Sequence, residues 1–98
     1  MRVLVVEDEV RLAATLQDLL ELNGYTVDVC HDGEAGLDNA LTSIYDVILL
    51  DVMLPKLDGF GVCELIRRQS RVPIVLLTAL DGEAEQLRGF DLEIDDYI

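Results

Sequence analysis

Residues 45–60 read YDVILLDVMLPKLDGF and raise a question about the whole chain. The four apolar residues at positions 47–50 include β-branched side chains and are typical of a strand buried on both faces. Asp51 follows at once, although a carboxylate at the rim of a core is costly to desolvate unless it is paired. Pro55 and Asp58-Gly59 then predict a loop before the next helix. An acid in this place indicates a site rather than a contribution to stability.

Outward from this strand, strand-like and helix-like segments alternate at spacings of about 20 to 25 residues, the size of short βαβ units. We expect right-handed crossovers and an α/β domain with a doubly wound parallel sheet. Strands are predicted over residues 3–6, 25–29 (an edge strand), 47–50 and 74–77, with a fifth beginning at 96. Helices are predicted to carry Leu12, Leu16, Leu19 and Leu20, then Leu37, Ala40, Leu41 and Ile44 after an Asp32 cap, then Phe60, Leu65 and Ile66, and last Ala84, Leu87 and Phe90 after an Asp81 cap.

The composition indicates one folded, acidic domain. The chain has 98 residues, of which 51% are hydrophobic, so we expect a single domain over residues 1–98. Its 20 acidic and 7 basic residues argue against direct nucleic-acid binding and favour a cationic partner, such as a divalent metal or a basic protein patch. No apolar run reaches membrane-spanning length, and Cys30 and Cys63 fit no metal or disulfide pattern, so we expect a cytoplasmic protein without membrane contact.

Polar side chains stand at the carboxyl ends of three predicted strands: Glu7-Asp8, Asp51 and Thr78. In an open parallel sheet these ends share one edge, and ligands bind where the strand order reverses. If the order is 2-1-3-4-5, as in flavodoxin-like folds, Glu7, Asp8 and Asp51 share one pocket. Clustered carboxylates repel one another unless a cation is present, and their hard oxygens suit Mg²⁺. The sequence therefore predicts a magnesium site.

The same arrangement suggests phosphoryl chemistry. A carboxylate beside Mg²⁺ can act as a nucleophile and form an aspartyl phosphate, while the metal positions the phosphoryl group and neutralises its charge. We expect Asp51 to be that nucleophile. Thr78 could donate its hydroxyl to a phosphate oxygen, and a backbone carbonyl just after Asp51 could add a metal ligand.

Four motifs, in order along the whole chain, carry a family resemblance: VLVVEDE at 3–9, DVILLDVMLPKLDGF at 46–60, PIVLLTA at 73–79 and DDYI at 95–98. Together they resemble the receiver domain of bacterial two-component response regulators. In detail, MRVLVVEDE, NGYTVDVC and MLPKLDGF look like the subfamily whose receivers precede a winged-helix DNA-binding domain.

The resemblance implies that Asp51 accepts a phosphoryl group from a sensor histidine kinase. It makes Glu7, Asp8, Asp51 and the main-chain carbonyl of Met53 the protein ligands of Mg²⁺. It further implies that Thr78 is the switch hydroxyl and Tyr97 the aromatic whose ring turns inward on phosphorylation. These last two residues would relay the change to an output surface.

Two departures from the family pattern bear on the C-terminal end. The family has a lysine three residues after that aromatic, which would be residue 100, and a fifth helix beyond it. We therefore expect residues 1–98 to be a receiver that lacks helix five. DNA would be bound only by a domain outside this chain, and a homodimer could bury the uncovered face. Glu93-Ile94 stands where the family usually has Gly-Ala, in the output region.

Two other functions stay open. An aspartate-nucleophile phosphatase of the haloacid-dehalogenase type also uses Mg²⁺, but it needs a second Asp two residues after the nucleophile, where this chain has Met53. A degenerate receiver could serve only for docking or dimerisation, although the intact acids and Thr78 argue against it. We favour the signalling switch, which is not an enzyme, and we place His31 in a solvated loop.

Overall fold

A five-stranded parallel sheet with the order β2-β1-β3-β4-β5 forms the centre of the molecule. The structure is a computed structural model of the chain, and it describes residues 1–77 and 96–97. The strand order confirms the predicted doubly wound α/β topology, with the strand after the first helix at one edge. The predicted fourth helix, with Asp81, lies outside the described residues.

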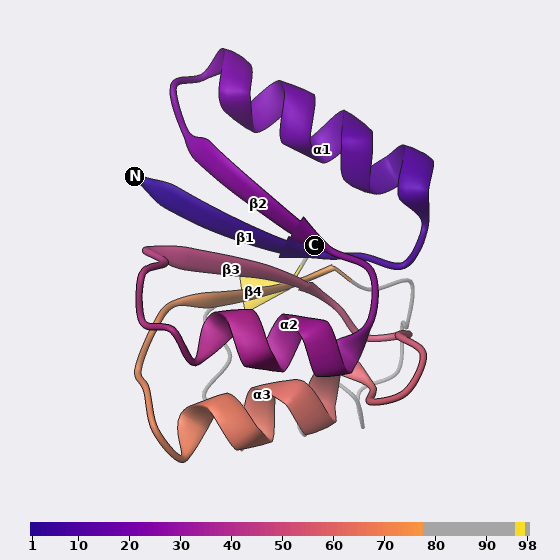
Figure 1. Cartoon of the computed structure of the whole chain (residues 1–98), viewed down its shortest axis with the longest axis vertical. Coiled ribbons are helices and arrows are strands. Elements are labelled where there is room, and N and C mark those ends of the chain that lie inside the picture. The colour runs from indigo at the N-terminus through magenta and orange to yellow at the C-terminus, as the bar shows by residue number, and fades with distance from the viewer. Residues whose placement is uncertain (78–95, 98) are drawn as a thin grey trace.

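In Figure 1, α1 covers one face of the sheet, and α2 and α3 lie side by side on the other. Each face of a central strand therefore has helices to pack against, as a parallel sheet requires. The strands are Arg2–Val6 (β1), Thr26–Cys30 (β2), Val47–Asp51 (β3), Ile74–Leu77 (β4) and Asp96–Tyr97 (β5), and the helices are Val10–Leu22 (α1), Gly33–Ala40 (α2) and Gly59–Arg67 (α3).

The main core lies between the sheet and the α2/α3 layer. Leu4, Ile48 and Leu76 of three adjacent strands are fully buried there, together with Ile66 of α3. A smaller cluster around Val5 packs under α1. In β3 the side chains facing α2 and α3 are fully buried, whereas those on the opposite face are only partly buried. The prediction that this strand is buried on both faces is therefore confirmed for one face and only partly for the other.

The predicted face of the first helix is partly wrong. The side chains that face the sheet are Ala13, which is fully buried, and Leu16 and Leu20, which pack on the cluster around Val5. Leu12 and Leu19 are 40% and 54% exposed. Leucines occupy so much of this helix that periodicity alone could not select its inner face.

The second helix ends earlier than predicted. Its N-cap is Asp32, as expected, with the side chain accepting a hydrogen bond of 2.8 Å from Ala35 N–H. The helix stops at Ala40, and Ser43 adopts a left-handed φ of 63°, which an α-helix cannot continue. Ile44 consequently lies outside the helix and is 49% exposed, so its predicted place on the helix is wrong.

Two residues mark the C-terminal ends of α1 and α3. Gly24 follows the end of α1 with a φ of 89°, a conformation that glycine adopts at little cost. Arg67 lies in the last turn of α3 and donates a hydrogen bond of 2.7 Å to the carbonyl oxygen of Val72. Among the helices of the described residues, none is long and apolar enough to cross a membrane.

Candidate functional site

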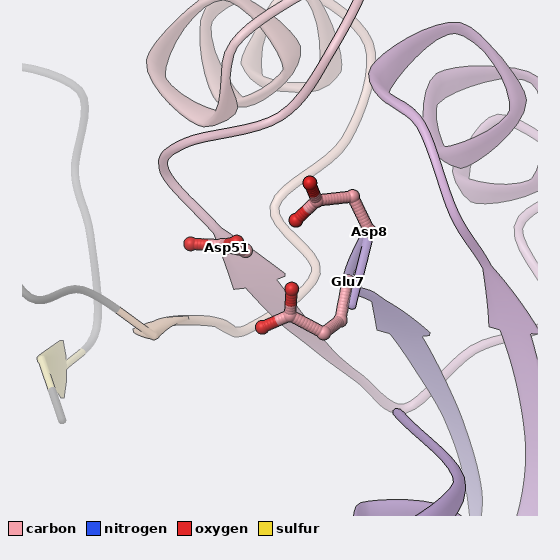
Figure 2. Close-up of side chains that lie close together, drawn as sticks. All are labelled: Glu7, Asp8 and Asp51. Carbon is pink, nitrogen blue, oxygen red and sulfur yellow. The ribbon is translucent and has the colours of Figure 1, made fainter. Parts of the chain in front are cut away.

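The sheet topology brings three carboxylates together. β1 and β3 are neighbouring parallel strands whose last paired residues are Val6 and Leu50. Glu7 and Asp8 follow β1 and Asp51 is the final residue of β3, so all three stand at one edge of the sheet (Figure 2). One carboxylate oxygen of each lies within 4.8 Å of the others. This is the cluster that the strand ends predict.

Glu7 is the buried acid of the cluster, with only 4% of its surface exposed. Burial raises the pKa of its carboxyl from 4.5 to about 7, and its contacts with Asp51 and Asp8 add to the rise. The amide of Glu9 opposes it by donating a hydrogen bond of 3.0 Å to Oε2. A side chain that could ionise freely in water is thus held where its charged form is disfavoured.

Asp51 is half-buried, and its surroundings act in the same direction. Desolvation is the largest cause that raises the pKa of its carboxyl, and the negative charge of Asp8 adds to it. The amide of Met53 donates a hydrogen bond of 3.2 Å to Oδ1, which favours the charged form. The net pKa is raised, so the charged form of Asp51 is disfavoured in the metal-free site.

A divalent cation fits this donor set. Within residues 1–77, no lysine, arginine or histidine forms an ion pair with the three acids, and Lys56, in the loop after β3, is paired with Asp32 at 3.7 Å. Carboxylate oxygens are hard ligands of the kind that Mg²⁺ takes, usually with water and a phosphate oxygen completing its shell. A cation among them would offset the mutual repulsion that adds to both raised pKa values, whose largest cause is desolvation.

The loop after Asp51 is held by the Asp58-Gly59 pair. Asp58 caps α3 by accepting a hydrogen bond of 2.8 Å from Gly61 N–H. Gly59 is needed for close packing, because a Cβ at this position would lie 2.3 Å from the main-chain oxygen of Asp51. Its amide also donates a hydrogen bond of 2.8 Å to Val52 O. The start of α3 is therefore packed directly against the end of β3.

An open pocket of about 580 Å³ lies over the cluster. Three of the residues that line it were not predicted from the sequence. Glu9 and Leu12 come from the β1–α1 turn and α1, and Leu77 is the last residue of β4. Only Leu77 could have been found from the sequence, because it lies at the end of a predicted strand. Its described lining consists of Glu7, Asp8, Glu9, Leu12, Asp51, Met53 and Leu77.

The remaining predicted residues differ in how far they are placed. Met53 lies beside Asp51 at the pocket, with its side chain 64% exposed. Thr78 is outside the described residues, and for Tyr97 only the backbone, in β5, is described. His31 is exposed, as predicted, but its Nδ1 lies 2.9 Å from the carbonyl oxygen of Glu7, a contact that no sequence signal indicated.

Comparison with known proteins gives a family match over nearly the whole chain. The model of the response regulator receiver domain matches residues 3–98. The transcriptional regulatory protein DltR of Streptococcus agalactiae is 46% identical over 100% of this chain and 44% of its own length. The response regulator ArlR of Staphylococcus aureus is 43% identical over 99% of this chain and 44% of its own length. The chain thus spans less than half the length of these relatives.

A solved structure agrees in both fold and sequence. The response regulator protein TrrA of Thermotoga maritima, determined in complex with Mg²⁺ and BeF, is 32% identical to this chain. The match covers 99% of this chain and 84% of the other, with a TM-score of 0.89. The resemblance to response regulators that control transcription is confirmed by the relatives' names. On the family match, the sheet order and these relatives, the chain belongs to the response regulator receiver domain family.

Proposed function

We propose that this chain is the phosphoryl-accepting switch of a two-component signalling system, with Asp51 as the acceptor. The observation that carries the proposal is the position of Asp51 at the end of β3, within reach of Glu7 and Asp8 and open to a pocket. A carboxylate oxygen of Asp51 attacks the phosphorus of a phosphohistidine on a sensor kinase. The P–O bond forms as the P–N bond breaks, and the imidazole leaves as a neutral ring that keeps the proton on its other nitrogen.

Glu7, Asp8, Asp51 and the main-chain carbonyl of Met53 would hold Mg²⁺. The ion would supply charge neutralisation for the phosphoryl group during transfer. Support comes from the three clustered carboxylates and from the related TrrA, which was solved with Mg²⁺ and BeF. The hydrogen bond from the Met53 amide to Oδ1 keeps one Asp51 oxygen oriented and leaves the other for the reaction.

The transmission of the signal forms the second part of the proposal. Thr78 would bind a phosphate oxygen through its hydroxyl, and Tyr97 would change its ring position in response, as the family resemblance implies. The protein would then control transcription in the cytoplasm, as a monomer or a homodimer. Because residues 1–98 carry a net charge of −13, we propose that DNA is contacted by other residues of the full-length protein.

The two alternatives are less well supported. A phosphatase needs a proton donor where Met53 stands, and a thioether cannot transfer a proton. A docking module would have no use for a cluster of acids that carries an electrostatic cost. We therefore propose a switch that is modified on Asp51 rather than an enzyme that turns over a substrate.

The test uses the full-length protein, acetyl phosphate as the donor and intact-mass spectrometry. We expect a gain of one phosphoryl group that requires Mg²⁺ and is lost in Asp51→Asn. Asp46→Asn is the matched control, since Asp46 is an exposed acid just before the other end of β3. A gain that persists in Asp51→Asn, or that fails equally in both variants, would contradict the proposal.

A further inference from the structure

The loop between β3 and α3, residues 52–58, carries the Met53 carbonyl and connects directly to Asp51. Its first part is attached to the sheet, because Val52 N–H donates to Leu77 O at 3.3 Å. Within the loop, Leu54 N–H donates to Val52 O at 3.2 Å. The second part, residues 55–57, leaves the sheet. Leu57 of this part packs against the main core, and the backbone of Pro55 meets the start of α2.

The second part of the loop rests on the N-terminus of α2. Gly33 N–H donates a hydrogen bond of 3.3 Å to Pro55 O. A Cβ on Gly33 would lie 1.8 Å from Leu57 O and 2.9 Å from Leu57 Cβ, so no side chain fits between helix and loop. Because the obstructing atoms include main chain, the helix and the loop would have to move apart to admit one. Glycine here serves close approach of two backbones.

A second contact joins the same two segments. Lys56 adopts a φ of 68°, an uncommon conformation for a residue with a side chain. Its ammonium lies 3.7 Å from Asp32 Oδ2, while the other oxygen of Asp32 caps α2 through Ala35 N–H. One aspartate therefore fixes the helix start and attracts the loop. In Figure 1 the start of α2 lies beside the loop that follows β3.

We propose that Asp32-Gly33 is the support that fixes the β3–α3 loop for metal binding and phosphoryl transfer, and that Gly33 is a positioning residue for that site. The inference rests on the proposed function, since it assumes that Met53 and Asp51 hold Mg²⁺. Mg²⁺ demands near-ideal octahedral geometry, so a displaced carbonyl is a poor ligand. Gly33 touches neither the ion nor the phosphoryl group and acts through the backbone of Pro55 and Leu57.

The test compares Gly33→Ala with Gly24→Ala in the full-length protein. Gly24 also resists substitution, because its φ is 89°, but it has open space around it and lies in the turn before β2. Both variants should lose stability. Calorimetric titration should show Mg²⁺ affinity about 10- to 100-fold weaker in Gly33→Ala, the range found when residues that support metal ligands are replaced. In Gly24→Ala it should change less than about twofold, a loss of no more than the few tenths of a kcal/mol expected at a remote site.

A second readout reports the loop without metal. The amide resonance of Met53 in metal-free protein should shift in Gly33→Ala and stay in place in Gly24→Ala. If the wild type and Asp51→Asn bind Mg²⁺ equally well, the proposed function is wrong. This comparison does not involve the glycine variants, so it tests the proposed function separately. If Mg²⁺ binding does depend on Asp51 and the two glycine variants bind Mg²⁺ equally well, the positioning role is wrong.

A milder change covers the case in which Gly33→Ala does not fold. Asp32→Asn keeps a side chain able to cap α2 but removes the attraction to Lys56. Because the pair is exposed and weak, we expect its removal to lower Mg²⁺ affinity only about two- to fivefold. Asp46→Asn removes the same charge at the opposite edge of the sheet and should change neither the affinity nor the Met53 resonance. Equal effects in the two aspartate variants overturn the inference.

Discussion

The burial of Glu7 predicts that the metal-free domain is less stable at neutral pH than in mild acid. The folded state raises the pKa of this carboxyl from 4.5 to about 7. A raised folded pKa means that the stabilisation is complete below the unfolded pKa and is lost as the pH rises through the folded value. The loss therefore falls between about pH 4.5 and about pH 7.

The magnitude follows from the pKa difference. At 1.36 kcal/mol for each pKa unit, the rise at Glu7 corresponds to about 3 kcal/mol of unfolding free energy. The raised pKa of Asp51 acts in the same direction. Asp28 and Asp32 have lowered pKa values, and their contribution is lost only as the pH falls through still more acidic values. The two effects occupy different pH ranges and can be separated.

Glu7→Gln isolates the effect, because glutamine has nearly the same shape and no charge at any pH. Urea unfolding followed by circular dichroism, with a chelator present, gives the free energy for each protein. We expect the variant to gain on the wild type by about 3 kcal/mol as the pH rises from 4.5 to above 7. Saturating Mg²⁺ should stabilise the wild type strongly at the upper pH and the variant much less. A difference between the two proteins that does not change with pH would refute the reasoning.

Two further substitutions test the packing around the site and the sheet edge. Gly59→Ala places a Cβ 2.3 Å from the main-chain oxygen of Asp51, and urea unfolding should show a loss of about 1 to 3 kcal/mol; an unchanged midpoint would contradict this contact. Tyr45→Phe removes a hydroxyl that donates to Asp28 at 2.7 Å and whose pKa is raised to about 12, so thermal unfolding should show a loss of about 1 kcal/mol. Tyr25→Phe is its control, since within residues 1–77 no hydrogen bond from that hydroxyl is found, and equal losses in both would count against the bond to Asp28.

The acid cluster could be predicted because it depends on topology alone. Once the strands alternate with helices, parallel pairing places the residues after β1 and the last residue of β3 at one edge. Glu7, Asp8 and Asp51 then meet because the flavodoxin-like strand order, assumed from the pattern, places β1 next to β3. The burial of Glu7 was harder to predict from the sequence, because it depends on how closely the neighbouring turns cover this side chain.

Other features depended on packing between distant segments. The contact of Gly33 with Leu57 exists because α2 and the β3–α3 loop lie side by side, and nothing near Gly33 in the sequence announces it. The exposure of Leu12 and Leu19 shows the same limit, since only the sheet decides which side of a leucine-rich helix faces inward. The early end of α2 is associated with the left-handed conformation of Ser43, and serine has no strong preference for this conformation.

The measurement that tests the central claim most directly is the location of the phosphoryl group. The full-length protein is treated with acetyl phosphate and Mg²⁺, the acyl phosphate is reduced with borohydride, and the fragmented peptides are sequenced by mass spectrometry. The account predicts that the reduced residue is Asp51 and that the modification is absent without Mg²⁺. Modification of another aspartate while Asp51 remains intact would contradict it.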